Sequence, residues 1–266
     1  ARIPMVYANI SRGGPGVGSI QPAQMDYYQA TKASGNGGFE MMVFAPATVQ
    51  EAVDMTYKAF DYADRDRNPV LILADGVIGT MMEPVVLPEM KSDEEVAAIK
   101  ASKQSWACVG HALDYAHRSW IQPGQWSTVR MQEANEDAAA LYASWEKDVQ
   151  VEECRLEDAE LVMTAYGISA RICKSSVDLL RAQGIKAGLF RPITLWPFPA
   201  DALERTTGHA KGYLSVEMNM GQMVEDVRLV VNGRAPVEFF GRTGGVIPTP
   251  AEVLDAIVAF DQKVGE

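Results

Sequence analysis

The most constraining feature of this sequence is a regular alternation of apolar runs and helical patterns that extends from about residue 158 to the end. The predicted strands are 161–166, 185–190, 213–218 and 237–240. Strands that alternate with helices of about 10–15 residues predict a parallel α/β sheet. Right-handed crossovers then bring the carboxyl ends of the strands to one edge, where ligands bind. Residues 158–266 are therefore expected to form one α/β domain.

Helix-end signals support the same interpretation. Gly184 is placed as the glycine that follows a helix, and Gly233 has the same relation to a predicted helix over 220–231. The last helix is expected to start at Thr249, with Pro250 at its first position and Glu252 completing a capping box. A short helix is expected around residue 202.

The first ninety residues alternate in the same way. The predicted strands are 3–9, 39–45 and 70–74. Thr48 and Glu51 have capping-box spacing, and apolar residues at helical spacing follow them to Ala63, which predicts a helix with one buried face. The run at 70–74 is apolar throughout, as in strands that are buried on both faces. Residues 1–88 are expected to form part of a second α/β domain.

Residues 89–157 lack this rhythm and are expected to form a partly helical connector. Ala134, Ala138, Leu141 and Trp145 recur at helical spacing, which predicts an amphipathic helix over about 131–147. We expect the connector to pack on both neighbours, although an insertion within one domain is the alternative. Its tryptophans are expected to serve as packing or interface anchors; they are Trp106, Trp120, Trp126 and Trp145.

The composition excludes several classes of protein. The chain has 266 residues and a formal net charge of −11, without the clustered Lys and Arg that nucleic acids or anionic membrane surfaces require. No apolar run approaches the roughly 20 residues of a membrane span. The cysteines, Cys108, Cys154 and Cys173, form no C-x-x-C pair, and the histidines, His111, His117 and His209, form no zinc motif. A reduced, cytoplasmic protein without a metal site of its own is expected.

The loop at 11–18 is the most unusual local feature. It has four glycines and one proline within eight residues, which lets a ligand or a partner backbone approach closely. Arg12 is its only charged residue, and a guanidinium suits a carboxylate or a phosphate. No Gly-Lys-Ser/Thr run follows, so it is not a P-loop. A tight surface loop with a solvated arginine is the plain alternative.

Polar residues also follow two of the predicted strands. Asp75 directly follows the strand at 70–74, Glu217 lies at the end of the strand at 213–218, and Asn219 and Gln222 come after it. Their position at the sheet edge makes them candidates for a ligand or for a subunit contact. The plainer interpretations are a turn-forming aspartate at 75 and a helix cap at Asn219.

Two groups of short runs carry a further signal. In the first half they are 12–18, Gln24-x-Asp26, 44–46 with 50–51, and 73–76; in the second half they are 188–199 and 216–226. Together they resemble the α subunit of 2-oxoacid:ferredoxin oxidoreductases over essentially the whole chain. Within that family the sequence of these runs is most similar to the 2-ketoisovalerate, or branched-chain, type.

This resemblance implies an enzyme that decarboxylates a 2-oxoacid on thiamine diphosphate, passes electrons to ferredoxin and transfers the acyl group to coenzyme A. It implies a pyrimidine-type thiamine domain and a domain similar to the C-terminal domain of transketolase in this subunit. A β subunit would hold the diphosphate and its magnesium ion, and γ and ferredoxin-like subunits would complete the complex. The iron–sulfur clusters would lie on partner subunits. No nucleic acid or membrane is expected as a partner.

The resemblance also assigns the residues of the loop. Arg12 matches the arginine that receives the substrate carboxylate, and the expected substrate site is Arg12, Gly13, Gly14, Gly16 and Val17. Members that act on dicarboxylic 2-oxoacids resemble R-x-G-P-S-T-G here, whereas this chain has Gly16 and Val17 at the serine and threonine positions. An apolar Val17 favours a branched-chain substrate such as 2-ketoisovalerate. Val17 as a loop-packing residue only is the alternative.

The chain departs from the family pattern at its beginning. The thiamine-activating glutamate and a Y-P-I-T-P-like segment precede the first strand in the family, and neither occurs here. We expect a chain that lacks an N-terminal portion, has no catalytic residue of its own, is inactive alone and exposes apolar edges in its first domain; a processed terminus is the plainer explanation of the first residue. The rival functions are a non-catalytic assembly subunit, a 2-oxoglutarate- or pyruvate-specific member, and a transketolase or branched-chain dehydrogenase type.

Overall fold

The first domain is built on a four-stranded sheet in the computed structural model, which describes residues 2–32, 37–107 and 127–265. Its strands are β1 (Met5–Ser11), β2 (Met42–Phe44), β3 (Pro69–Asp75) and β7 (Thr194–Trp196). They lie in the order β1-β3-β2-β7, with β1 and β2 parallel to β3 and with β7 antiparallel to β2. The apolar run at 70–74 is the buried core of β3, as predicted. The strand predicted at 3–9 extends to Ser11, and the run at 39–45 forms a strand over only three residues.

Three helices accompany this sheet: α1 (Tyr27–Thr31), α2 (Val49–Asp66) and α3 (Gly76–Thr80). Thr48 caps α2 as predicted, because its hydroxyl accepts the amide hydrogen of Glu51 at 3.1 Å. The Glu51 carboxylate accepts from the amide of Ala47 at 2.7 Å instead of closing the box on Thr48. The buried face of α2 is narrower than predicted, since Phe60 is 55% exposed.

The second domain has a five-stranded sheet, as the alternation of strands and helices predicts. Its strands are β4 (Val151–Cys154), β5 (Leu161–Thr164), β6 (Ala187–Pro192), β8 (Gly212–Glu217) and β9 (Val237–Gly241). They lie in the order β4-β6-β5-β8-β9, and all pairs are parallel except β4 with β6. The helices are α6 (Gly167–Ala182), α7 (Ala200–Thr206), α8 (Met223–Val231) and α9 (Pro250–Gly265).

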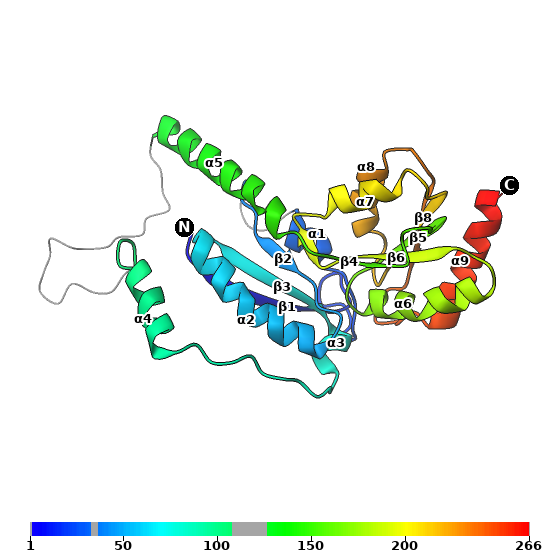
Figure 1. Ribbon diagram of the computed structural model, residues 1–266, viewed down its shortest axis with the longest axis horizontal. Helices are drawn as coiled ribbons and strands as arrows, with labels where there is room; N and C mark the ends of the chain where they lie inside the picture. Colours follow the sequence, from blue (N-terminus) through cyan, green and yellow to red (C-terminus); the bar gives the residue numbers. More distant parts are fainter. Residues whose placement is uncertain (1, 33–36, 108–126, 266) are drawn as a thin grey trace, which may run out of the picture.

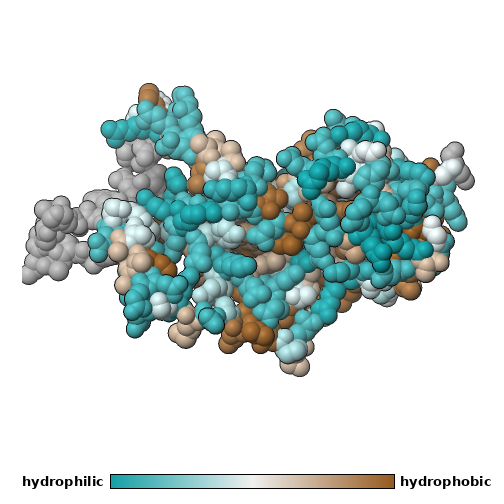
Figure 2. Space-filling model, in the orientation of Figure 1, coloured by the Kyte–Doolittle hydropathy of each residue, from teal (hydrophilic) through white to brown (hydrophobic). Residues whose placement is uncertain are grey.

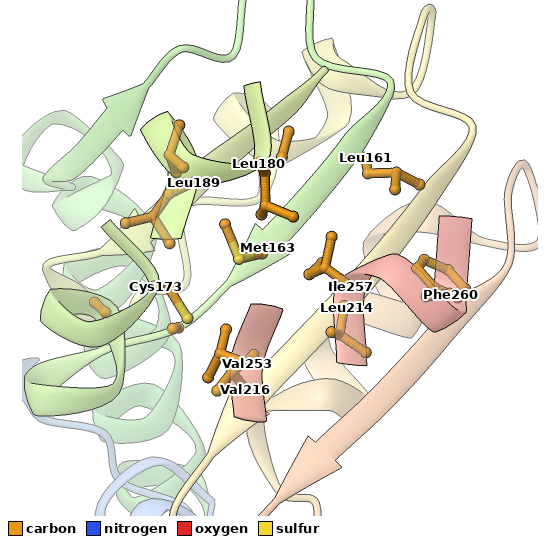
Figure 3. Packing of buried hydrophobic residues seen from close by; sticks show 14 residues of the cluster. Leu161, Met163, Cys173, Leu180, Leu189, Leu214, Val216, Val253, Ile257 and Phe260 are labelled. Atoms are coloured by element: carbon orange, nitrogen blue, oxygen red, sulfur yellow. The ribbon is translucent and has the colours of Figure 1, made fainter. Parts of the chain in front are cut away.

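The core of this domain lies between the sheet and the pair α6 and α9. Leu161, Met163 and Leu214 from the strands meet Leu180 and Ile257 from the helices (Figure 3). A second apolar cluster on the opposite face includes residues of α7 and α8. Both faces of the sheet are therefore covered, which is why every residue of the central strands β5, β6 and β8 is buried.

The helix-end signals of the second domain are largely confirmed. Gly184 has φ +86° directly after the residue that ends α6. Thr249 and Glu252 exchange both capping-box hydrogen bonds, at 2.8 and 3.2 Å. The α8 helix ends at Asn232, which takes the left-handed conformation one residue before the predicted Gly233.

The connector contains α4 (Asp93–Ser102), α5 (Thr128–Ala143) and a 3-10 turn, η2 (Ser144–Asp148). The helix predicted over 131–147 thus starts earlier, and its last residues belong to η2. The predicted apolar face is packed only at its C-terminal end, where Trp145 is buried and Leu141 packs against the same cluster. The rest of α5 has no buried residue and projects from the body of the molecule (Figure 1). Its spacing is that of an amphipathic helix, but alanines at Ala134 and Ala138 offer little apolar surface for another element to cover.

The connector tryptophans differ in their environment. Trp145 is buried against the first domain, where its indole N–H donates to Asp66 at 2.9 Å. Trp106 lies under the Arg67 guanidinium, 4.5 Å from the ring centroid. Trp120 and Trp126 lie outside the described residues. The connector therefore packs on the first domain through Trp145 and on the second through β4 (Val151–Cys154), which pairs with a strand of the second sheet, as predicted.

The first domain exposes apolar side chains on its edge strand and on the segment that follows α3. Edge strand β1 leaves Met5, Tyr7 and Ile10 between 41% and 49% exposed. The extended segment after α3, seen as a brown patch below α2 in Figure 2, exposes Met82 and Leu87. Among the described residues, no helix is long and apolar enough to cross a membrane.

The two domains are interlocked. Strand β7 comes from the second half of the chain but joins the first sheet, and β4 comes from the connector but joins the second. Arg191 on β6 is buried and binds Glu51 of α2 at 3.0 Å and Glu152 of β4 at 2.7 Å. Strand β7 thus lies in the first sheet although its residues belong to the predicted range 158–266, and β4 lies in the second sheet although its residues belong to 89–157. The division into 1–88, 89–157 and 158–266 stays a prediction.

Candidate functional site

The glycine-rich loop leaves β1 at the carboxyl edge of the parallel sheet. It is closed by hydrogen bonds from the amide of Ser19 to Gly13 O at 2.8 Å and from the amide of Gly13 to Gln21 O at 2.9 Å. Gly18 has φ +49°, and a Cβ there would lie 1.9 Å from Gly13 O. The loop therefore folds back on its own backbone as only glycine permits.

Arg12 is exposed at the base of this loop. Its Nη1 donates to the carbonyl oxygens of Val17 and Ser19, the latter at 3.1 Å. Within residues 2–32, 37–107 and 127–265, its Nε and Nη2 have no protein acceptor. The loop carbonyls therefore orient the guanidinium, while two of its nitrogens can still donate to an anion.

The apolar side chains of the loop face the solvent beside Arg12. Val17 and Ile20 are each 87% exposed. Gly13 is buried, whereas Gly14 and Gly16 leave space around the backbone. A Cβ at Gly14 would have only the Met25 Cβ nearby, at 3.9 Å, and one at Gly16 would meet nothing within 4 Å. The arrangement suits a ligand with a carboxylate at one end and an apolar group at the other.

Asp75 lies in the contact between the two domains. One carboxylate oxygen accepts from the amides of Val77 and Ile78 at 3.1 Å, which caps α3. The other accepts from the amide of Ile168, in the second domain, at 2.8 Å. Burial raises the pKa of this carboxyl group, although these hydrogen bonds oppose the shift. Both oxygens are occupied, so the geometry favours the domain contact over a ligand.

Glu217 is fully buried at the start of α8 and accepts five hydrogen bonds. The donors are the amides of Gln222, Met223 and Val224 and the side chains of Ser215 and Asn219, at 2.8–3.2 Å. Positive charge density at the helix N-terminus stabilises such a carboxylate. The prediction that Asn219 caps this helix is therefore wrong, because Glu217, and not Asn219, accepts from the amides at the start of α8.

Asn219 and Gln222 reach across to the first domain instead. The Asn219 amide donates to Gln24 O at 2.9 Å, and its oxygen accepts from the amide of Gly221 at 2.7 Å. Gln222 donates to Met25 O at 2.9 Å and accepts from the amide of Tyr28 at 3.0 Å. The structure thus brings the strand-end candidates together, but their hydrogen bonds join the two domains and do not form a ligand site.

Gln24 is the centre of this cluster, and sequence reasoning did not single it out. Its side chain is 1% exposed and donates to Tyr166 O at 2.9 Å. Its oxygen accepts from the Ser169 hydroxyl at 2.9 Å and from the amide of Met218 at 3.0 Å. The only sequence signal was the Gln24-x-Asp26 run, because its partners lie 51 to 195 residues away.

The remaining polar candidates form no metal site within the described residues. No group of three or more His, Cys, Asp or Glu side chains is placed to hold a metal ion there. His209 binds Leu156 O at 2.9 Å, and burial raises the pKa of the Cys154 and Cys173 thiols. Cys108, His111 and His117 lie outside the described residues.

Comparisons with known proteins agree across the whole chain. A model of the thiamine diphosphate-binding domain of pyruvate flavodoxin/ferredoxin oxidoreductases matches residues 1–153, and one of pyruvate:ferredoxin oxidoreductase core domain II matches residues 159–253. Ketoisovalerate oxidoreductase subunit VorB of Methanothermobacter thermautotrophicus is 40% identical over 97% of this chain and 71% of that protein. 2-Oxoglutarate synthase subunit KorA of Archaeoglobus fulgidus is 33% identical over 90% of this chain and 67% of that protein.

A solved structure has the same fold. It is 2-oxoglutarate:ferredoxin oxidoreductase from Magnetococcus marinus, with 2-oxoglutarate, coenzyme A and succinyl-CoA bound. The TM-score is 0.76 at 18% identity, over 97% of this chain and 49% of that chain. This chain therefore spans about half of that polypeptide.

Proposed function

This chain belongs to the α subunits of the 2-oxoacid:ferredoxin oxidoreductases, and from this premise we propose that it positions 2-ketoisovalerate in a complex that converts it to an acyl-CoA. Ferredoxin is the proposed electron acceptor. The observation that carries the proposal is the loop at 12–18, where an oriented guanidinium stands beside an exposed valine. The similarity to ketoisovalerate oxidoreductase subunits supports the same substrate.

Arg12 is proposed to hold the substrate carboxylate. Its Nη1 is engaged by loop carbonyls, which fixes the plane of the guanidinium, and its other nitrogens are available to a ligand. A charged hydrogen bond of this kind contributes about 1.5–3 kcal/mol. Holding the carboxylate would fix the orientation of the adjacent keto carbon, which is the atom that reacts.

Val17 is proposed to favour a branched apolar side chain over a second carboxylate. It has no hydroxyl to offer such a group, and an unpaired carboxylate beside an apolar surface is costly. Each methylene that a branched substrate buries against this side chain is worth about 0.8 kcal/mol. Gly13, Gly14 and Gly16 would leave the room in which the substrate lies.

Thiamine diphosphate and its magnesium ion are proposed to be shared with a β subunit. The described residues do not fit the complete cofactor, because they hold no metal-binding group and the buried carboxylates Asp75 and Glu217 are already occupied. For this reason we propose that the chain is inactive alone. Coenzyme A is the proposed co-substrate, the iron–sulfur clusters are assigned to γ and ferredoxin-like partners, and the complex is placed in the cytoplasm.

The test is Arg12→Ala in the assembled complex, with a viologen dye as electron acceptor and a panel of 2-oxoacids. We expect KM for 2-ketoisovalerate to rise by about 10- to 100-fold, the equivalent of the lost charged hydrogen bond, while the complex still assembles. Arg205→Ala, which removes an exposed arginine of α7, is the matched control. An unchanged kcat/KM in the Arg12 variant would favour the rival function, a non-catalytic assembly subunit.

A further inference from the structure

A loop of the second domain lies directly against the glycine-rich loop. It is the segment Arg242–Gly245, which follows β9 and precedes α9. The Ser19 hydroxyl donates to Gly244 O at 3.0 Å, and the Thr243 hydroxyl lies 3.6 Å from the Met25 sulfur. A Cβ at Gly13 would lie 3.3 Å from the carbonyl carbon of Gly244. The two loops thus meet backbone to backbone.

Gly245 makes the tightest of these contacts. Its φ is +100°, and a Cβ at this position would lie 2.1 Å from the Cβ of Gln21. Two carbon atoms without a bond between them prefer a separation of about 3.5–4.0 Å. Any side chain at Gly245 would therefore force Gln21 to move by about 1.5 Å.

The contact leads to Arg12 through two short steps. Gln21 O accepts the amide hydrogen of Gly13, and Ser19, which binds Gly244, presents its own carbonyl to the Arg12 guanidinium at 3.1 Å. A displacement of residues 19–21 therefore moves an acceptor that orients Arg12. Within the described residues, the guanidinium itself makes no hydrogen bond to the Arg242–Gly245 segment.

The Arg242–Gly245 segment is anchored in the second domain at Arg242. The amide of Arg242 donates to Glu217 O at 3.2 Å, and its guanidinium binds Glu252 of α9 at 2.7 Å. The atom that a side chain at Gly245 would meet belongs to Gln21, whose carbonyl oxygen holds the amide of Gly13. A side chain at Gly245 is therefore expected to disturb the closure of the glycine-rich loop.

We propose that Gly245 is a positioning residue for substrate binding, and that the Arg242–Gly245 segment is a wall that sets the orientation of Arg12. This inference rests on the proposed function, since it assigns the second domain a part in holding the substrate carboxylate. It predicts that substrate affinity depends on a residue that does not touch Arg12.

The test compares Gly245→Ala with Gly233→Ala in the assembled complex. Both glycines have a positive φ, +100° and +74°, but a Cβ at Gly233 would meet nothing within 4 Å. The Gly233 variant therefore carries the backbone strain of alanine without the contact. Because a misplacement of about 1 Å can cost as much as 100-fold, we expect KM for 2-ketoisovalerate to rise by about 10- to 100-fold in Gly245→Ala alone.

A second variant tests the contact itself. Gln21→Gly removes the Cβ that an alanine at position 245 would strike, so the double variant Gly245→Ala with Gln21→Gly should regain most of the lost affinity. A role limited to folding would lower the yield of complex or its melting temperature, and the double variant would not restore KM selectively.

The outcomes separate this inference from the proposed function. If Arg12→Ala raises KM and Gly245→Ala behaves like Gly233→Ala, the Arg242–Gly245 segment does not orient Arg12, and the proposed role of Arg12 in substrate binding stands. Equal KM values in the single and double Gly245 variants would also overturn the contact with Gln21. If Arg12→Ala leaves KM unchanged, the proposed function fails first, whatever the glycine variants do.

Discussion

Gln24 offers the sharpest test of how the two domains are held together. Its side chain makes hydrogen bonds to Tyr166 O, the Ser169 hydroxyl and the amide of Met218, all in the second domain, at 2.9–3.0 Å. All three partners are at most 2% exposed. Gln24→Ala removes these three hydrogen bonds from groups that bulk water does not reach.

The expected loss follows from these partners. Tyr166 O also accepts the amide hydrogen of Ala170 at 3.2 Å, so only the Ser169 hydroxyl and the Met218 amide lose their partner. A buried donor or acceptor that loses its partner costs about 1–3 kcal/mol, so two of them give an upper range near 6 kcal/mol. The Ser169 hydroxyl can rotate and a water molecule can enter the space, so we expect about 4 kcal/mol. At about 2–4 °C per kcal/mol for a chain of this size, Tm should fall by roughly 8–16 °C.

The assay is urea unfolding followed by circular dichroism and by tryptophan fluorescence. Gln132→Ala is the matched control, because Gln132 is an exposed glutamine of α5 with one side-chain hydrogen bond, to Glu136 at 2.8 Å. That control should change the free energy of unfolding by less than about 0.5 kcal/mol. If Gln24→Ala lost no more than the control, the network around Gln24 would not be what joins the domains.

Val17→Thr in the complex should lower the preference for 2-ketoisovalerate over 2-oxoglutarate in a competition assay, and an unchanged ratio would remove Val17 from the choice of substrate. Calorimetry of this chain alone with thiamine diphosphate and magnesium should give no saturable heat at micromolar concentrations; a clear isotherm would contradict a cofactor shared with a β subunit. The amide of Thr249 and the guanidinium of Arg242 lower the pKa of Glu252 from 4.5 to about 2. The stability from this cap is thus complete above pH 4.5 and is lost as the pH falls toward 2, so the gap in stability between wild type and Glu252→Gln should narrow over that window; a constant gap in urea titrations would refute it. Tyr7, 45% exposed on edge strand β1, should promote self-association of the isolated chain, so Tyr7→Lys should lower the sedimentation coefficient at high concentration, and equal coefficients would argue against this edge.

Local patterns predicted the elements whose determinants lie within a few residues. The α9 capping box formed between Thr249 and Glu252 because both partners belong to one turn. Strands β5, β6 and β8 were predicted from short apolar runs that alternate with helical patterns. The glycines at 13–18 marked a folded-back loop because positive φ angles and close backbone contacts are local requirements.

Helical spacing alone did not predict burial. The α5 helix formed over its alanine-rich stretch, yet it has no buried residue, because a stripe becomes a buried face only when another element covers it. Propensity decides that such a segment is helical, whereas tertiary contacts decide whether it is packed. Trp145 continues the same spacing but is buried, because the first domain covers it and supplies Asp66, 79 residues away, as its hydrogen-bond acceptor.

Local patterns in the sequence were enough to predict the α/β class, the position of Arg12 beside a glycine-rich turn and the family resemblance. The roles of the polar residues at the strand ends depend on contacts that form only in the folded chain. Glu217 caps α8, Asp75 joins α3 to α6, and Gln24 ties both to one buried network. The contact of Gly245 with Gln21 is of the same kind. These pairs lie far apart along the chain, and a hydrogen bond or a close approach between them exists only after both domains have folded and met.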